Sequence, residues 1–211
     1  MITASTLRRI ELAQNLMLGA SLALLGLLPP FLAFWPEALP AWLPSTLYGL
    51  SLGLATATMS IRPIADFLPG LKPFVTLRKG MGVLSASAVI VFLIAKLLLD
   101  APGYLASMAT AAYWSLDGHA VLAHLGDLSA IPLLLTSNKF SRRVMGPWWK
   151  RVQKLSYVYF YAGASYEVLA LWSDLAVLAI AAVTSLTLGA WFYKSGQASV
   201  AGPAAVPSAT A

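Results

Sequence analysis

Hydrophobic residues are gathered into six long segments, and few polar residues separate them. The segments lie at about 12–35, 46–61, 80–99, 118–135, 155–172 and 175–193. Several approach the roughly 20 apolar residues that a helix needs to cross a bilayer core. The pattern predicts an all-α integral membrane protein, folded as one six-helix bundle over residues 12–193. Residues 1–11 are predicted to be a cytoplasmic N-terminus, and residues 194–211, with small side chains and prolines, a disordered cytoplasmic tail.

Composition supports the membrane interpretation. The 211 residues are 59% hydrophobic and 10% charged, with a mean hydropathy of +0.75. Soluble domains contain about 25% charged residues, so this chain has too few polar side chains to cover a soluble surface. A signal peptide is a competing interpretation of the first segment, but the run is long and no clear small-residue cleavage site follows. Because the chain has no cysteine, disulfides, thiolate metal sites and iron–sulfur clusters are excluded.

Lysine and arginine alternate between the loops. Two precede the first segment, four lie at 62–79, six lie at 139–154, and Lys194 follows the last segment, whereas the other three loops have none. Cytoplasmic loops of membrane proteins are rich in Lys and Arg. We therefore expect a multi-pass protein of the bacterial inner membrane with both termini in the cytoplasm. Merging the last two segments into one helix is the alternative, and it would place Lys194 outside.

The net charge of +6 is explained by this orientation, so we expect no nucleic-acid partner. The basic loop at 139–154 is also suited to anionic lipid headgroups or to the acidic face of a partner protein.

Several short motifs occur in order around this charge pattern. They are LLPPF at 27–31, RPI at 62–64, LRKGMGVL at 77–84, LTSN at 135–138, MGPWWKRVQKL at 145–155 and a tyrosine at 157. With these motifs, residues 16–173 resemble the ferric-reductase-like transmembrane family. The nearest likeness is to the haem-binding membrane subunit of the periplasmic methionine sulfoxide reductase system. The resemblance implies a six-helix fold with b-type haem held between helices.

The resemblance also implies where the haem ligands should be, and histidine is missing there. By position they fall at Phe92, Gln153 and Tyr166. Tyrosine can ligate ferric haem, but one tyrosine does not replace a bis-histidine site. His119 and His124 are five residues apart, which turns a helix by about 500°, so they diverge by roughly 140° and cannot bind both faces of one haem.

We therefore expect no cofactor and no metal. The alternative is a b-type haem or a chlorophyll-type pigment, bound through His124 or Tyr166.

Four ionisable residues are predicted to lie inside the membrane: Lys96, His124, Asp127 and Glu167. Such residues are costly in a bilayer and usually face the bundle interior or a wet cavity. The predicted topology brings them to a comparable depth as one polar cluster. Lys96–Glu167 and His124–Asp127 are candidate pairs, the latter on one helix face.

A structural interpretation of this cluster is that these groups neutralise one another and hold the helices in register. Lys96 can also snorkel outward or pair with Asp100. The functional interpretations are a ligand or pigment site and a proton or ion path.

A retained fold without its ligands predicts an accessory or scaffold subunit of a larger membrane complex, respiratory or photosynthetic. The expected partners are membrane lipids and other membrane subunits. No complete catalytic site is evident, so enzymatic activity is not expected. The alternatives are an electron-transfer protein with one atypically ligated haem, and a small-molecule or ion carrier built on the polar cluster.

Overall fold

The computed structural model describes residues 3–35, 42–115 and 119–200. In this part of the chain the regular structure is entirely helical. The elements are α1 (Ala4–Phe34), α2 (Leu43–Phe67), η2 (Pro69–Thr76), α3 (Leu77–Met108), η3 (Ala111–Trp114), α4 (Ala120–Thr136), α5 (Lys139–Met145), α6 (Pro147–Gln153), α7 (Leu155–Leu171) and α8 (Asp174–Val200), where η marks a 3₁₀-helix.

The all-α prediction is confirmed, and each of the six predicted segments coincides with one of the longer helices. Three helical stretches are long and apolar enough to cross a membrane: Ala4–Phe34, Pro69–Leu99 and Asp174–Gln197. The pair α4 and α5 would add a fourth span if counted together, although the two helices are bent by 93°. Helix α7 has 17 residues, the short limit for a span. Six spans therefore remain a prediction.

Several helices extend beyond the apolar segments that identified them. Helix α2 continues through Phe67, and α3 continues to Met108, into stretches predicted to be loops. The predicted basic loop instead forms α5 and α6, separated by Gly146 with a φ of 52°. Helix α8 reaches Val200, so the predicted tail begins inside a helix, and residues 201–211 lie outside the described part. Hydropathy marks the apolar part of a helix, whereas its ends depend on caps and breakers.

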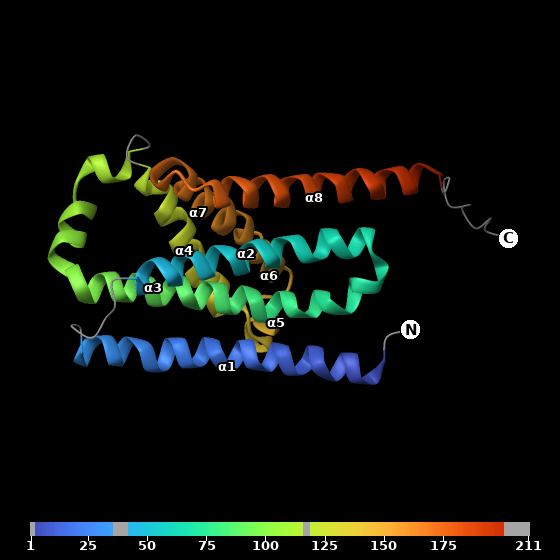
Figure 1. Ribbon diagram of the computed structural model, residues 1–211, viewed down its shortest axis with the longest axis horizontal. Helices are drawn as coiled ribbons and strands as arrows, with labels where there is room; N and C mark the ends of the chain where they lie inside the picture. The colour runs from blue at the N-terminus through green and yellow to red at the C-terminus, as the bar shows by residue number, and fades with distance from the viewer. Residues whose placement is uncertain (1–2, 36–41, 116–118, 201–211) are drawn as a thin grey trace.

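Five helices pack in a closed ring. Helix α2 contacts α3 and α8, α3 contacts α4, and α7 contacts both α4 and α8. Helix α1 lies outside the ring against α3 and η2. Figure 1 shows α1, α2, α3 and α8 along the long axis, with the start of α1 and the end of α8 at the same end of the molecule. The last part of α3, which contains Pro102, turns away from this axis (Figure 1).

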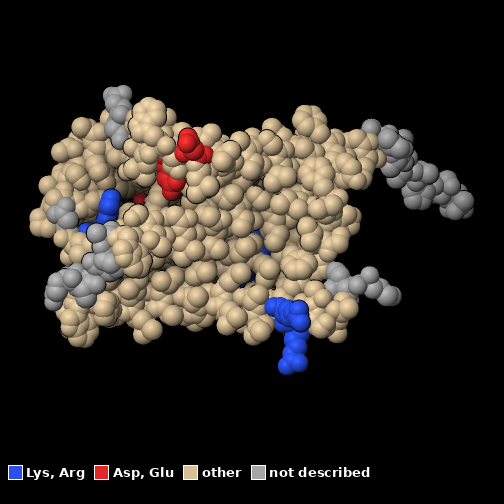
Figure 2. All heavy atoms as spheres, in the orientation of Figure 1, with Lys and Arg blue, Asp and Glu red and all other residues tan. Residues whose placement is uncertain are grey.

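Small side chains make up much of the interior, and many large apolar side chains face outward. Alanines and serines fill much of the core, and Ser85, Ser87 and Ala88 are fully buried. Large leucines on α1, such as Leu22 and Leu27, are more than 70% exposed. The face in Figure 2 is mostly uncharged and carries only a few basic and acidic side chains. Close helix packing through small residues with an apolar exterior is typical of membrane bundles.

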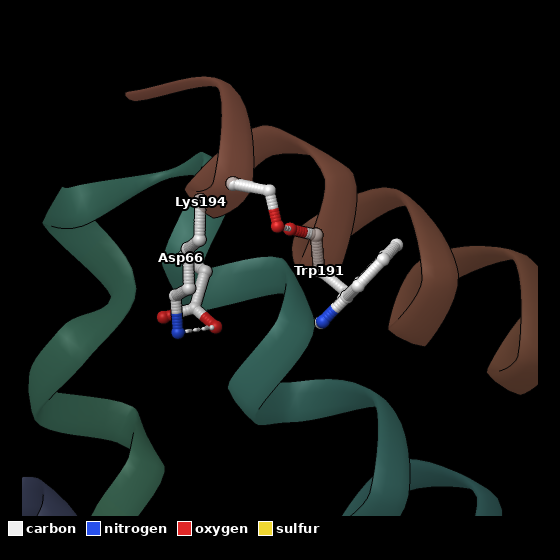
Figure 3. A network of polar contacts seen from close by, with 4 residues as sticks. Asp66, Trp191 and Lys194 are labelled. Atoms are coloured by element: carbon white, nitrogen blue, oxygen red, sulfur yellow. Dashed lines mark hydrogen bonds and ion pairs between the residues drawn. The ribbon is translucent and has the colours of Figure 1, made fainter. Parts of the chain in front are cut away.

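One ion pair joins α2 to α8 near the end of the molecule where α8 finishes. Lys194 Nζ lies 2.7 Å from Asp66 Oδ2, and the Ser195 hydroxyl donates to the Trp191 carbonyl beside it at 3.0 Å (Figure 3). The Lys194 side chain is 53% exposed. A pair of this kind contributes at most about 1 kcal/mol to stability.

Candidate functional site

The two predicted intramembrane carboxylates come together. Asp127 on α4 and Glu167 on α7 are 6% and 7% exposed. Both line one small cavity of about 20 Å³, together with Tyr48, Ser51 and Tyr159, and we call it the carboxylate cavity. This volume holds about one water molecule, because a water needs at least about 10–15 Å³. The cavity thus gathers carboxylate and hydroxyl oxygens from three helices.

Neither predicted charge pair forms within the described residues. Lys96 is exposed, and its Nζ lies over the rings of Phe92 and Tyr104, at 5.3 and 5.6 Å from their centroids. This arrangement agrees with the outward snorkelling considered for Lys96. Pairing with the Asp100 side chain falls outside the described part. His124 and Asp127 differ by about 60° around the helix, enough to face different neighbours.

His124 sits in a cage of aromatic rings. The rings of Tyr113, Trp114 and Tyr104 lie 4.7, 5.1 and 6.3 Å from its own, centroid to centroid. Its Nε2 atom is buried and has no hydrogen-bond partner. Tyr113 belongs to η3, outside the predicted spans, and burial together with the hydrogen bond to Tyr104 raises the pKa of its hydroxyl. Both tyrosines therefore remain neutral near pH 7.

The residues at the family's haem positions do not fit a haem. Tyr48 lies between Phe92 and Tyr166, with ring centroids 5.3 and 6.5 Å away, so side chains fill this space. The third position, Gln153, donates a hydrogen bond from Nε2 to Thr136 Oγ1 at 3.1 Å. The nitrogen of His124 has no exposed surface within its aromatic cage. At Phe92, Tyr166 and His124 a macrocycle would have to displace neighbouring rings.

The place of Asp127 is set by a close crossing of α4 and α7. A Cβ atom on Gly126 would lie 3.2 Å from the backbone nitrogen of Gly163 and 3.3 Å from its Cα. Only glycine allows this approach without moving a backbone. The crossing brings Asp127, the next residue, against α7 and toward Tyr159 and Glu167.

Three hydroxyl groups form a buried cluster beside the carboxylate cavity. The Tyr159 hydroxyl makes a short hydrogen bond with the Ser51 hydroxyl and a second with the Ser85 hydroxyl at 2.8 Å. The Ser85 hydroxyl also lies 2.8 Å from the Ser51 carbonyl oxygen, to which it can donate. Ser51 and Ser85 are 3% and 0% exposed. The cluster ties α2, α3 and α7 together.

A larger cavity, of about 800 Å³, opens where α4 ends and α7 begins. Six cationic side chains line it: Arg62, Arg78, Lys79, Lys139, Arg142 and Lys150. Among the described residues that line it, none is aspartate or glutamate. We call this the cationic cavity.

The deeper wall of the cationic cavity is apolar and hydroxylic. It includes Met59, Ala86 and Leu133, and it ends on Ser85 and Tyr159. The lining therefore combines charged side chains with buried apolar ones.

Short helices hold one side of the cationic cavity in place. The Asn138 side chain caps α5 by accepting from the backbone nitrogen of Ser141 at 2.7 Å. The Trp149 indole donates to the Thr136 carbonyl at 2.8 Å, and the Arg142 guanidinium lies 5.5 Å from the Trp149 ring. These contacts fold the basic segment back over α4.

The sequence identified the buried carboxylates but neither the cationic cavity nor the hydroxyl cluster. The two basic loops were interpreted mainly as signals of orientation. The loop at 139–154 was also judged suited to anionic lipid, but nothing in the sequence indicated that it meets residues 62–79 at one cavity. Serines 51 and 85 carry no pattern that distinguishes them from other small packing residues. Tyr159 lies in the aromatic stretch YVYFY at 157–161, where nothing distinguishes it from tyrosines that only pack.

The chain matches no protein-family model, and comparisons with curated proteins and with solved structures gave no match. The ferric-reductase-like resemblance therefore stays a prediction.

Proposed function

We propose that this chain is a membrane protein of the bacterial inner membrane that binds an anionic amphiphile in the cationic cavity. The observation that carries the proposal is the lining of that cavity, with six cations and no carboxylate among the described residues. Cations left without carboxylate partners favour a phosphate or carboxylate group as ligand.

The two-part lining supports an amphiphile over a small inorganic anion. The six cations share the lining with apolar side chains such as Met59, Ala86 and Leu133, which are buried in the bundle. Ligand pockets commonly measure about 300–1,000 Å³ and are mainly apolar with a few polar groups that fix orientation. A headgroup would contact the cations and an acyl chain the apolar wall. In the proposed topology, with both termini cytoplasmic, the cations lie at headgroup level of the inner leaflet.

Binding to the purified protein in a neutral detergent tests this proposal. Dihexanoyl phosphatidylglycerol is expected to raise the thermal unfolding midpoint, because a ligand that binds only the folded state stabilises it. Dihexanoyl phosphatidylcholine, with the same chains and no net charge, is the matched control and is expected to have little effect. Added NaCl should weaken the shift, since salt screens the cations.

The other outcomes distinguish an anionic lipid from a soluble phosphate as the ligand. Equal shifts with both lipids would reduce the effect to chain binding and end the proposal. If inorganic phosphate or glycerol phosphate shifts the midpoint as much as the anionic lipid, the ligand is a soluble phosphate and not an amphiphile. No shift with any probe would also end it.

An accessory subunit of a larger membrane complex is the second candidate. Gly49 and Gly53 on α2 are exposed, lie four residues apart, and would meet nothing within 4 Å if given a Cβ atom. This spacing lets another helix approach closely.

Native gel electrophoresis of membranes extracted in mild detergent tests this candidate. We expect Gly53→Leu to shift the protein to a smaller species, and Gly26→Leu, at an open position on α1, to leave the large species intact. A wild-type protein that migrates as a monomer would contradict the candidate.

A further inference from the structure

The cationic cavity and the carboxylate cavity share a wall. Tyr159 and Ala55 line both of them. Ser85 lines only the cationic cavity, and Ser51 lines only the carboxylate cavity. The Tyr159 hydroxyl is hydrogen-bonded to both serines. A continuous row of three hydroxyl groups thus crosses the wall from one cavity to the other.

Each hydroxyl in this row can accept a proton on its oxygen while releasing its own. Serine and tyrosine hydroxyls are both donors and acceptors. The Ser85 and Tyr159 hydroxyl oxygens lie 2.8 Å apart, within the normal hydrogen-bonding range. The serine pair itself is 3.3 Å apart, oxygen to oxygen. Tyr159 is therefore the central member of the row.

On the far side of the row, oxygen atoms continue to the protein surface. Ser51, Asp127 and Glu167 surround a cavity that holds about one water molecule. The backbone N–H of Ser173, in the turn between α7 and α8, donates to the backbone carbonyl of Glu167 at 3.2 Å, so Glu167 lies at the base of this turn. The neighbouring Trp172 is 87% exposed, so this turn is at the surface.

Other ionisable groups border this route without interrupting it. Tyr48 from α2 lines the carboxylate cavity, and Tyr166 is the residue immediately before Glu167 on α7. Lys96 from α3, His124 from α4 and the tyrosines Tyr104 and Tyr113 contact one another and do not line the carboxylate cavity. Of these groups, only Tyr48 lines the cavity that holds Asp127 and Glu167.

We propose that this route transfers protons between the α7–α8 turn and the cationic cavity. A proton binds Glu167 from the surface and passes through the cavity water to Asp127 and then to the Ser51 oxygen. Ser51 releases its own proton to Tyr159, Tyr159 releases its proton to Ser85, and Ser85 releases its proton to water or to an anion in the cationic cavity. No electron moves and no heavy-atom bond breaks. The route does not depend on a bound amphiphile.

Proton flux into liposomes tests the route. Full-length protein is reconstituted with a pH-sensitive dye inside, and the external pH is lowered in the presence of potassium and valinomycin to prevent charge build-up. We expect wild-type liposomes to acidify faster than protein-free ones. Tyr159→Phe should slow the protein-dependent rate by about tenfold or more, because it removes the central donor and keeps the ring.

Tyr161→Phe is the matched control on the same helix. Its hydroxyl contacts Thr184 at 3.0 Å and lines neither cavity, so the flux should match wild type. Ser85→Ala and Asp127→Asn provide further variants if Tyr159→Phe does not fold. A wild-type flux equal to that of protein-free liposomes, or a flux that Tyr159→Phe leaves unchanged, overturns the route. Retained lipid binding by Tyr159→Phe would show that amphiphile binding and the proton route are independent of each other.

Discussion

The double variant Arg78→Gln with Arg142→Gln is expected to bind dihexanoyl phosphatidylglycerol at least about tenfold more weakly than the wild-type protein. The two arginines lie on α3 and α5 and line the cationic cavity from different helices. Glutamine keeps some hydrogen-bonding capacity and much of the length but removes the charge. A hydrogen bond to a charged group contributes about 1.5–3 kcal/mol, and about 1.4 kcal/mol corresponds to a tenfold change in affinity.

The measurement is the lipid concentration that gives half of the maximal stabilisation. Arg143→Gln is the control, because this residue is adjacent to Arg142 and exposed but is absent from the cavity lining. It lowers the net charge without changing the cavity. If Arg143→Gln weakened binding as much as the double variant does, the effect would come from the overall charge, and the cavity would lose its assigned role.

Hydropathy predicted the number and approximate position of the longer helices. A bilayer requires long apolar stretches, so each of the six helices that contain one could be located from the sequence. The ends were not predictable in the same way. Helix α3 continues past Leu99 to Met108 because helical geometry does not require apolar residues. The break at Gly146, with its positive φ, makes two helices from what looked like one loop.

The candidate site was only half predictable. Asp127 and Glu167 stand out because a carboxylate is costly inside an apolar membrane segment and usually marks a functional site. Their partners did not stand out, because partners depend on which helix faces which. Lys96 is at a similar depth, yet it is exposed and lies over aromatic rings. The hydroxyl row needs residues 51, 85 and 159 to meet, and no local pattern encodes that meeting.

The cationic cavity was hidden for a different reason. Positive residues in cytoplasmic loops have a sufficient explanation in membrane orientation, so their number gives no information about binding. Arg62 and Lys150 are far apart in the sequence and meet at one cavity only because α6 folds back over the end of α4. The same charges can serve orientation and binding, and the tertiary structure decides whether they converge.

Gly126→Ala is expected to destabilise the protein by about 1–3 kcal/mol, the range for overpacking in a well-packed interior. The added methyl group would lie 3.2–3.4 Å from the backbone of α7, at Gly163 and at the Tyr159 carbonyl. A backbone cannot rotate away as a side chain can, so α4 and α7 must separate. We expect a thermal unfolding midpoint several degrees below that of the wild type.

Gly53→Ala separates this effect from the general effect of replacing a helical glycine. Its Cβ atom would meet nothing within 4 Å, so the midpoint should be unchanged or higher, because alanine favours a helix by up to about 1 kcal/mol relative to glycine. Separation of α4 from α7 would also move Asp127 away from Tyr159, so Gly126→Ala should reduce proton flux in liposomes together with stability. Equal midpoints for the two variants would mean that α4 and α7 do not cross at Gly126. A lowered midpoint with full proton flux would keep the crossing but remove its link to the proposed route.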